Sequence, residues 1–314
     1  MAGQNKNYNP DLDGLRRGDA VTVRSLDEIL ATLDGHSKLD GLPFMPEMTR
    51  FCGKTFRVYR RAEKTCVEGF GMRSMSDAVF LEGLRCDGSA HGGCQRGCLF
   101  FWKKAWLRAE GSGRRAEREK SEIRNPKSEI ENPSQLPAVR GDRFFCQSTE
   151  LAAATSDYPP GKVRHYLHDL RVGEMTLRRF AFLLWMALAN RVWRLFHGRR
   201  FYQITGQRQK TLSAELNLRP GELVEVKSAE EIAATLDARG RNRGLQFEPE
   251  MARHCGRRYR VATPVRAIIA EESGKMVQLS NTVILEGLAC QGICFHNCPR
   301  ANYLYWREIW LRQV

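Results

Sequence analysis

Two long segments of this 314-residue chain match each other at a nearly constant spacing. GDAVTVRSLDEILATLD at 18–34 corresponds to GELVEVKSAEEIAATLD at 221–237, an offset of 203 residues. From LEGL at 81–84 and 285–288 onward the offset is 204, so one residue is gained in between. Each copy spans about 90 residues, the size of a small domain. A segment written twice indicates a folding unit that is used twice.

The duplication predicts how the whole chain is organised. FFCQSTELAAATSDY and VRHYLHDL predict short helices between the copies, and MTLRRFAFLLWMALANRVWRLFHG predicts a long one. A charged, apolar-poor stretch in which KSEIRNP is followed by KSEIENP predicts disorder. The expected parts are an N-terminal tail at 1–17, a first cysteine-rich repeat at 18–109, a disordered linker at 110–140, a basic helical segment at 141–217 and a second cysteine-rich repeat at 218–314.

Each copy predicts the same series of elements. GDAVTVRS and GELVEVKS alternate apolar and polar residues after a glycine, which is typical of a strand. Ser25 precedes Glu28 by three residues, and Ser228 precedes Glu231 in the same way. This spacing is a capping box, so we expect a short helix inserted after the first strand. Two further strands joined by a glycine-bearing turn follow.

The end of each copy is aromatic. Trp102 and Trp106 lie four residues apart, as do Trp306 and Trp310, which is helical spacing. The pattern predicts a closing aromatic helix whose apolar stripe belongs to the core, with a binding platform as the other interpretation.

The strand starts GDAVTV and GELVEV, together with the order of the strands, resemble SH3-like small β-barrels. The resemblance implies an α+β chain of two SH3-like small β-barrel repeats, each with a short inserted helix and a closing aromatic helix. A helical segment would join them. No functional residue is carried over by this resemblance.

Ten cysteines occur in the chain, and its first residues, MAGQNKNYNPDLDGLRRGD, contain no apolar run typical of a secretory signal. We therefore expect a cytoplasmic protein whose thiols stay reduced. In that compartment many cysteines indicate metal binding or redox chemistry before structural disulfides.

Four cysteines in each copy could surround one metal centre. Three positions match between the copies, and the fourth lies four residues after Cys94 in the first copy but four residues before Cys298 in the second. A spacing of four places two side chains on one face of a helical turn. The predicted ligands are Cys52, Cys86, Cys94 and Cys98 in the first copy, and Cys255, Cys290, Cys294 and Cys298 in the second.

Four thiolates suit tetrahedral zinc, and a [4Fe-4S] cluster is the alternative cofactor. A small barrel has a thin core, so a structural metal would add folding free energy. The competing interpretation is that the cysteines are small buried apolar side chains. His91 and His296 could replace a thiol or support one from nearby. Cys66 and Cys146 have no match, and we expect them to be buried or incidental.

The middle of the chain is strongly basic. Residues 161–210 hold 11 Lys and Arg against two acidic residues, within a chain of net charge +14. The excess favours an anionic partner, which could be an acidic protein, a nucleic acid or a membrane surface. The candidate anion-binding residues are Arg191, Arg194, Arg199 and Arg200.

An unbroken apolar run, FAFLLWMALA, occupies 180–189 within this basic segment. Ten apolar residues are too few for a transmembrane span. A buried helix between the two barrels is the expected structure. The other interpretations are a helix in an anionic membrane interface and arginines that contact nucleic-acid phosphates.

No phosphate-binding glycine loop, nucleophile elbow or dinucleotide fingerprint occurs. Glu47 matches Glu250, and such carboxylates could do acid–base chemistry or form buried ion pairs. The sequence predicts a metal-binding, zinc-containing tandem-repeat protein that acts as a binding or accessory module, cytoplasmic or peripheral at the membrane. The alternatives are an iron–sulfur or redox enzyme component and a nucleic-acid-binding protein. Enzymatic activity and oligomeric state stay open.

Overall fold

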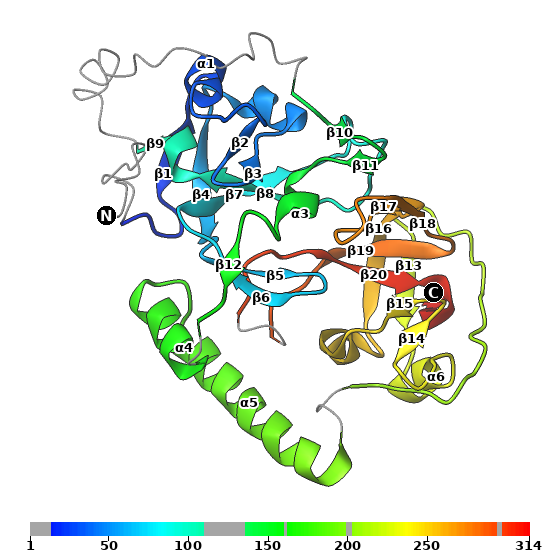
Figure 1. Cartoon of the computed structure of the whole chain (residues 1–314). Coiled ribbons are helices and arrows are strands. Elements are labelled where there is room, and N and C mark those ends of the chain that lie inside the picture. The colour runs from blue at the N-terminus through cyan, green and yellow to red at the C-terminus, as the bar shows by residue number, and fades with distance from the viewer. Residues whose placement is uncertain (1–13, 110–135, 160–161, 199–202, 294–296) are drawn as a thin grey trace. The chain divides into compact units, whose positions relative to one another are not determined.

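The computed structural model of the chain describes residues 14–109, 136–159, 162–198, 203–293 and 297–314 (Figure 1). Most of the predicted tail and linker, at 1–13 and 110–135, therefore lies outside the described residues. The chain divides into two compact units. Unit 1 comprises Met1–Met175, Ile269–Met276 and Cys298–Arg300, and unit 2 comprises Thr176–Ile268, Val277–Asn297 and Ala301–Val314.

A five-stranded antiparallel sheet forms the centre of unit 1, with the strand order β8-β7-β4-β1-β9. It curls into a half-barrel, and Val21 and Val23 of β1 are fully buried on its inner face. The strands are β1 (Ala20–Val23), β4 (Thr55–Arg61), β7 (Ala78–Arg85), β8 (Leu99–Lys103) and β9 (Leu107–Ala109).

Unit 2 contains a second curled five-stranded sheet, with the order β20-β19-β16-β13-β21. Its pairing resembles that of the first sheet: Ala20 lies opposite Arg57 in the first, and Leu223 lies opposite Arg260 in the second. The chain is thus a mixed α/β protein with two half-barrel sheets. The strands are β13 (Leu223–Val226), β16 (Arg258–Pro264), β19 (Thr282–Ala289), β20 (Tyr303–Arg307) and β21 (Leu311–Gln313).

Short elements fill the connections between these strands. In the first copy they are α1 (Leu26–Leu30), β2 (Lys38–Leu39), β3 (Leu42–Pro43), η2 (Pro46–Phe51), β5 (Lys64–Val67), β6 (Gly71–Ser74) and η3 (Lys104–Trp106). In the second copy they are α6 (Ala229–Ala233), β14 (Arg241–Asn242), β15 (Leu245–Gln246), η5 (Pro249–His254), β17 (Ala267–Ile269), β18 (Met276–Gln278) and η6 (Glu308–Trp310). Between the copies lie β10 (Val139–Arg140), β11 (Arg143–Phe144), α3 (Gln147–Glu150), β12 (Ser156–Asp157), α4 (Lys162–Arg171) and α5 (Leu177–His197).

The inserted helices are confirmed. In α1 the Ser25 amide donates to a Glu28 carboxylate oxygen at 3.0 Å, and the Glu28 amide donates to the Ser25 hydroxyl at 3.3 Å. Ser228 and Glu231 make the same two bonds in α6, at 2.9 and 3.2 Å. The reciprocal bonds satisfy amides that a helix start leaves free, which explains why such short helices form.

The predicted closing aromatic helix is wrong in both copies. Trp102 lies in β8 and Trp106 in the 3-10 turn η3, and Trp306 and Trp310 take the equivalent places in β20 and η6. A spacing of four residues fits one face of a helix, but it also equals two periods of a strand. All five residues of β8 are buried, so the polar positions that would distinguish the two are missing. The core interpretation is correct, because all four indoles are fully buried.

The long helix α5 is confirmed, but the expectation that it is buried is wrong. It begins after Thr176, whose hydroxyl accepts from the Arg179 amide at 3.3 Å, and ends at Gly198 in the left-handed conformation. Leu183 and Met186 are buried. The exposed large apolar residues of the helix are Leu177, Phe182, Leu184, Trp185, Leu188, Val192, Leu195 and Phe196. None of the described helices combines the length and apolar content needed to cross a membrane.

Candidate functional site

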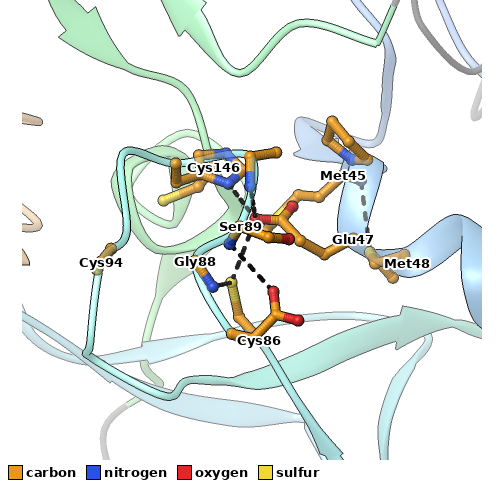
Figure 2. A network of polar contacts seen from close by, with 12 residues as sticks. Met45, Glu47, Met48, Cys86, Gly88, Ser89, Cys94 and Cys146 are labelled. Carbon is orange, nitrogen blue, oxygen red and sulfur yellow. Dashed lines mark hydrogen bonds and ion pairs between the residues drawn. The ribbon is translucent and has the colours of Figure 1, made fainter.

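Four cysteines line one cavity of about 30 Å³ in unit 1. Cys86 follows β7, Cys94 and Cys98 lie in the loop before β8, and Cys146 is the N-cap of α3. The Cys86 amide donates to the Cys98 carbonyl at 2.8 Å, which closes the loop at its base. Figure 2 shows Cys86 beside Glu47, with Cys146 on a separate segment. One loop, at 86–98, and the distant start of α3 thus bring four thiols to one place.

Glycine determines the path of this loop. Gly88 has a φ of +72°, and a Cβ there would lie 2.2 Å from the Cys94 carbonyl oxygen. Its amide donates to the Cys86 sulfur at 3.4 Å, and its carbonyl accepts from the His91 amide at 2.9 Å. Only a residue without a side chain fits both the backbone conformation and the close approach. The segment CDGSAHGGC therefore places Cys94 next to its own start.

A buried pair of Glu47 and His91 supports the loop. His91 Nδ1 lies 2.6 Å from a Glu47 carboxylate oxygen, and its Nε2 lies 2.9 Å from the Phe145 carbonyl. Burial opposes ionisation of both groups, but their hydrogen bond lowers the pKa of Glu47 and raises the pKa of His91. A nitrogen that faces a carbonyl must donate, so both ring nitrogens carry protons in the ion pair. His91 then has no lone pair for a metal.

Glu47, Cys86 and His91 have ligand atoms all within 4.8 Å of one another, and among the residues that the structure describes they form the one such group. The ion pair accounts for this proximity without a metal. The Cys86 thiol lies 3.7 Å from the Glu47 carboxylate and can donate to it.

Burial keeps the thiols of Cys86, Cys94 and Cys146 protonated. It raises the pKa of Cys86 far above its ordinary value, with a further contribution from the Glu47 carboxylate. Burial also raises the pKa of Cys94 and brings the pKa of Cys146 to about 12. These groups are neutral at pH 7 until a cation displaces their protons, because a metal binds the thiolate.

A second buried cluster of unit 1 surrounds Glu271, which follows β17. Its carboxylate lies 2.6 Å from the Arg300 guanidinium and 3.3 Å from that of Arg96, and it accepts from the Ser148 hydroxyl at 2.9 Å. Burial opposes ionisation of Glu271, but the two arginines hold its pKa below the usual value. The charge is therefore compensated by residues from three separate parts of the sequence.

Each of these arginines also binds a strand end. Arg300 donates to the Cys66 carbonyl at 2.7 Å, and Arg96 donates to the Ile269 carbonyl at 2.9 Å. Cys66 and Ile269 match at an offset of 203, and Arg96 and Arg300 match at 204. The two contacts are thus made by equivalent residues of the two copies.

Cys94 and Cys298, which lie two residues before these arginines, also make equivalent contacts. The Cys66 amide donates to the Cys298 sulfur, and the Ile269 amide donates to the Cys94 sulfur, both at 3.3 Å. The Cys66 and Cys298 sulfurs lie 3.5 Å apart. The hydrogen bond from Cys66 lowers the pKa of Cys298 to about 7 although burial opposes this. Cys66, expected to be buried or incidental, is therefore half-buried and part of a thiol pair with the buried Cys298.

The remaining predicted ligands lie elsewhere. Cys52 and Cys255 are the half-buried C-caps of η2 and η5, and Cys52 does not line the cavity. Burial raises the pKa of Cys52 to about 11. In unit 2, Cys290 accepts from the Gly292 amide at 3.4 Å and lies 3.8 Å from Glu250. Cys294 lies outside the described residues, as does His296.

Several site residues were missed. Comparison of the two copies could not point to Cys146, because it lies outside both of them. The same comparison could have pointed to Glu271 and Arg300. Glu68 matches Glu271, and the arginines of CQR and CPR match each other. Among the predicted anion-binding residues, Arg191 and Arg194 are exposed on α5, whereas Arg199 and Arg200 lie outside the described residues.

A larger pocket of unit 1, about 130 Å³ in volume, is lined mainly by charged side chains. Lys64 lies 2.5 Å from Asp169, and Arg60 lies 3.3 Å from Glu174. Since these groups neutralise each other, the pocket presents no unbalanced charge through them to a ligand.

Comparisons with protein-family models, with curated proteins and with solved structures found no match for this chain.

Proposed function

We propose that unit 1 holds one zinc ion through Cys86, Cys94, Cys98 and Cys146, and that the protein is a metal-stapled binding or accessory module. The observation that carries the proposal is the convergence of four thiols on one cavity. Four thiolates in a tetrahedron are a common structural zinc site. Cys146 replaces Cys52 in the set expected from the sequence.

The size of the cavity favours a single ion. A volume of about 30 Å³ exceeds the roughly 10–15 Å³ that one water needs. A [4Fe-4S] cluster would bring eight heavy atoms into the same space. Zn–S bonds of about 2.3 Å place the sulfurs of a tetrahedral site about 3.8 Å apart. No three of the cavity sulfurs lie mutually within 4.8 Å, so the thiols must close onto the ion.

The wide spacing of the cavity sulfurs supports a second candidate, an iron–sulfur cluster. A cluster presents several metal atoms, so its cysteines need not approach one another as closely as four ligands of one ion. This candidate would make the protein a redox component, and it requires the loop to move outward.

The zinc would act as a staple. It would join the loop after β7 to α3, a single helical turn that has little core of its own. Folding free energy from metal binding is largest where a small domain buries little apolar surface. Equal strand orders further support the proposal that the two half-barrels are SH3-like copies of one duplicated unit. A second site with Cys255, Cys290, Cys294 and Cys298 stays a prediction from the sequence.

Elemental analysis of anaerobically purified full-length protein tests the proposal. We expect one zinc per chain if the unit 1 site alone is filled and two if the second site is filled as well. Cys98→Ser and Cys146→Ser should each lose one equivalent and unfold at lower temperature. Cys52→Ser is the matched control and should keep its zinc. Iron with broad visible absorption would favour the cluster, and a metal-free, fully folded protein would refute both candidates.

A further inference from the structure

α5 is a single long helix (Figure 1). Its exposed large apolar residues form a stripe along its whole length. Successive helical residues are rotated by about 100°, so Leu177, Leu184, Leu188 and Leu195 fall within about 40° of one another. Their exposed fractions reach 68% at Leu177 and 78% at Leu195.

Large aromatic side chains border the stripe. Phe182 and Trp185 stack with ring centroids 6.3 Å apart, and both are exposed, as is Phe196. The buried residues Leu183 and Met186 lie on the opposite side of the helix. The helix therefore uses a narrow face for its own fold and presents a wider apolar face outward. Exposed apolar surface of this extent indicates an interaction site.

The charge around the stripe has one sign. No acidic residue occurs between Glu174 and Glu215, while that interval contains eight Lys and Arg. Within the helix, Arg178 lies near its start, and Arg191 and Arg194 lie in its last two turns and are exposed. Arg179 is held by Asn297 of the same unit at 2.9 Å. An outward apolar face framed by cations, without acids, complements a surface that is apolar inside and anionic at its border.

We propose that α5 binds the surface of an anionic lipid membrane, lying in the interface with its leucine stripe among the acyl chains and its arginines at the headgroups. Leu, Phe and Trp on one face together with basic residues are the features of interfacial helices. A helix of 21 residues is about 30 Å long, but arginines near both of its ends and within its last turns favour a position on the membrane surface. The proposal stands independently of the metal site.

Two other partners fit the stripe less well. A second copy of this chain would bring its own basic residues to the contact, and like charges would repel with no acid to compensate them. Nucleic acid would use the arginines but would leave the leucines exposed to water. A lipid surface satisfies the apolar stripe and the cations together.

Co-sedimentation of the full-length protein with sucrose-loaded vesicles tests the inference. We expect binding to vesicles that contain phosphatidylglycerol, little binding to pure phosphatidylcholine, and weakening as salt is raised from 0.1 to 1 M because headgroup attraction is screened. Leu184→Glu/Leu188→Glu should lower the partition coefficient by at least about tenfold, since it places charge in the apolar region. Arg191→Gln/Arg194→Gln should lower it by about tenfold.

Matched controls are Val277→Glu and Arg239→Gln, which change exposed residues that are not part of α5 and should bind like the wild type. Circular dichroism checks that every variant stays folded. Equal binding to neutral vesicles, no binding to anionic ones, or an unchanged partition coefficient in the leucine variant would overturn the proposal. So would a dimer in sedimentation velocity that the leucine variant dissociates, or nucleic-acid binding by a wild-type protein that does not bind anionic vesicles.

Discussion

Several single residues of unit 1 neutralise the charge of a buried partner. Glu47 and His91 form an ion pair beneath the cysteine loop, and Glu271 is held by Arg96 and Arg300. A buried charge is costly unless it is paired and hydrogen-bonded, so each of these groups depends on its partner. Their first effect is to position the loop that carries Cys94.

The residue-scale prediction concerns Glu28, the capping residue of α1. Burial opposes its ionisation, but bonds from Ser25 and the charges of Arg108 and Arg24 hold its pKa below 4.5. Glu28→Gln should cost about 1 kcal/mol in the free energy of unfolding at pH 7. A lowered pKa contributes stability above pH 4.5 that is lost as pH falls through the folded value. Urea unfolding between pH 7 and 3 should therefore show the difference shrink.

Glu231→Gln is the control for Glu28→Gln, because Glu231 makes the same cap at an exposed position. Its cost should be smaller, since Arg312 is half exposed and solvent screens the pair. An equal or larger pH dependence in Glu231→Gln would contradict the role assigned to the Glu28 environment.

Among the elements, the cysteine loop at 86–98 depends on the backbone conformation at one position, Gly88. Gly88 and Gly93 have nearly the same positive φ, 72° and 73°, but only a Cβ at Gly88 would strike backbone atoms. Comparing alanine substitutions at the two glycines therefore separates two contributions to the loss of stability. One is the strain of a side chain in the left-handed conformation, and the other is the displacement of Cys94.

Gly88→Ala should destabilise the protein by more than about 3 kcal/mol and expose the loop thiols, because the backbone of Cys94 must move. Gly93→Ala should cost only about 1 kcal/mol, the strain of a positive φ with open space around it. Urea unfolding and the rate of thiol labelling at Cys94 measure both effects. Equal costs for the two variants would show that the close approach to Cys94 is absent.

At the scale of the whole molecule, unit 1 is completed by residues from the end of the chain. Ile269–Met276 and Cys298–Arg300 belong to it by contact although they come from the second copy. Removing charged side chains of these two segments should therefore lower the free energy of unfolding of unit 1, most of which comes from the first half of the sequence.

Arg300→Gln tests this dependence. It removes the 2.6 Å contact with Glu271 and the bond to the Cys66 carbonyl, so we expect a loss of about 3 kcal/mol and faster labelling of Cys66. Arg312→Gln removes two exposed ion pairs, with Glu225 and Glu231, and should cost far less because solvent screens them. A variant as stable as the wild type, with Cys66 still protected, would contradict the place of Cys298–Arg300 in unit 1.

The sequence by itself determined what local chemistry controls: the capped helices after Ser25 and Ser228, the first strands, the long α5 and the burial of the tryptophans. These depend on neighbours a few residues away, whose bonds and periodicity can be read from the order of residues. Only the tertiary structure decided that Trp102 lies in a strand, that α5 is exposed and that Cys146 shares a cavity with Cys86. An even spacing fits both helix and strand, and a contact between distant segments leaves no periodic trace in either of them.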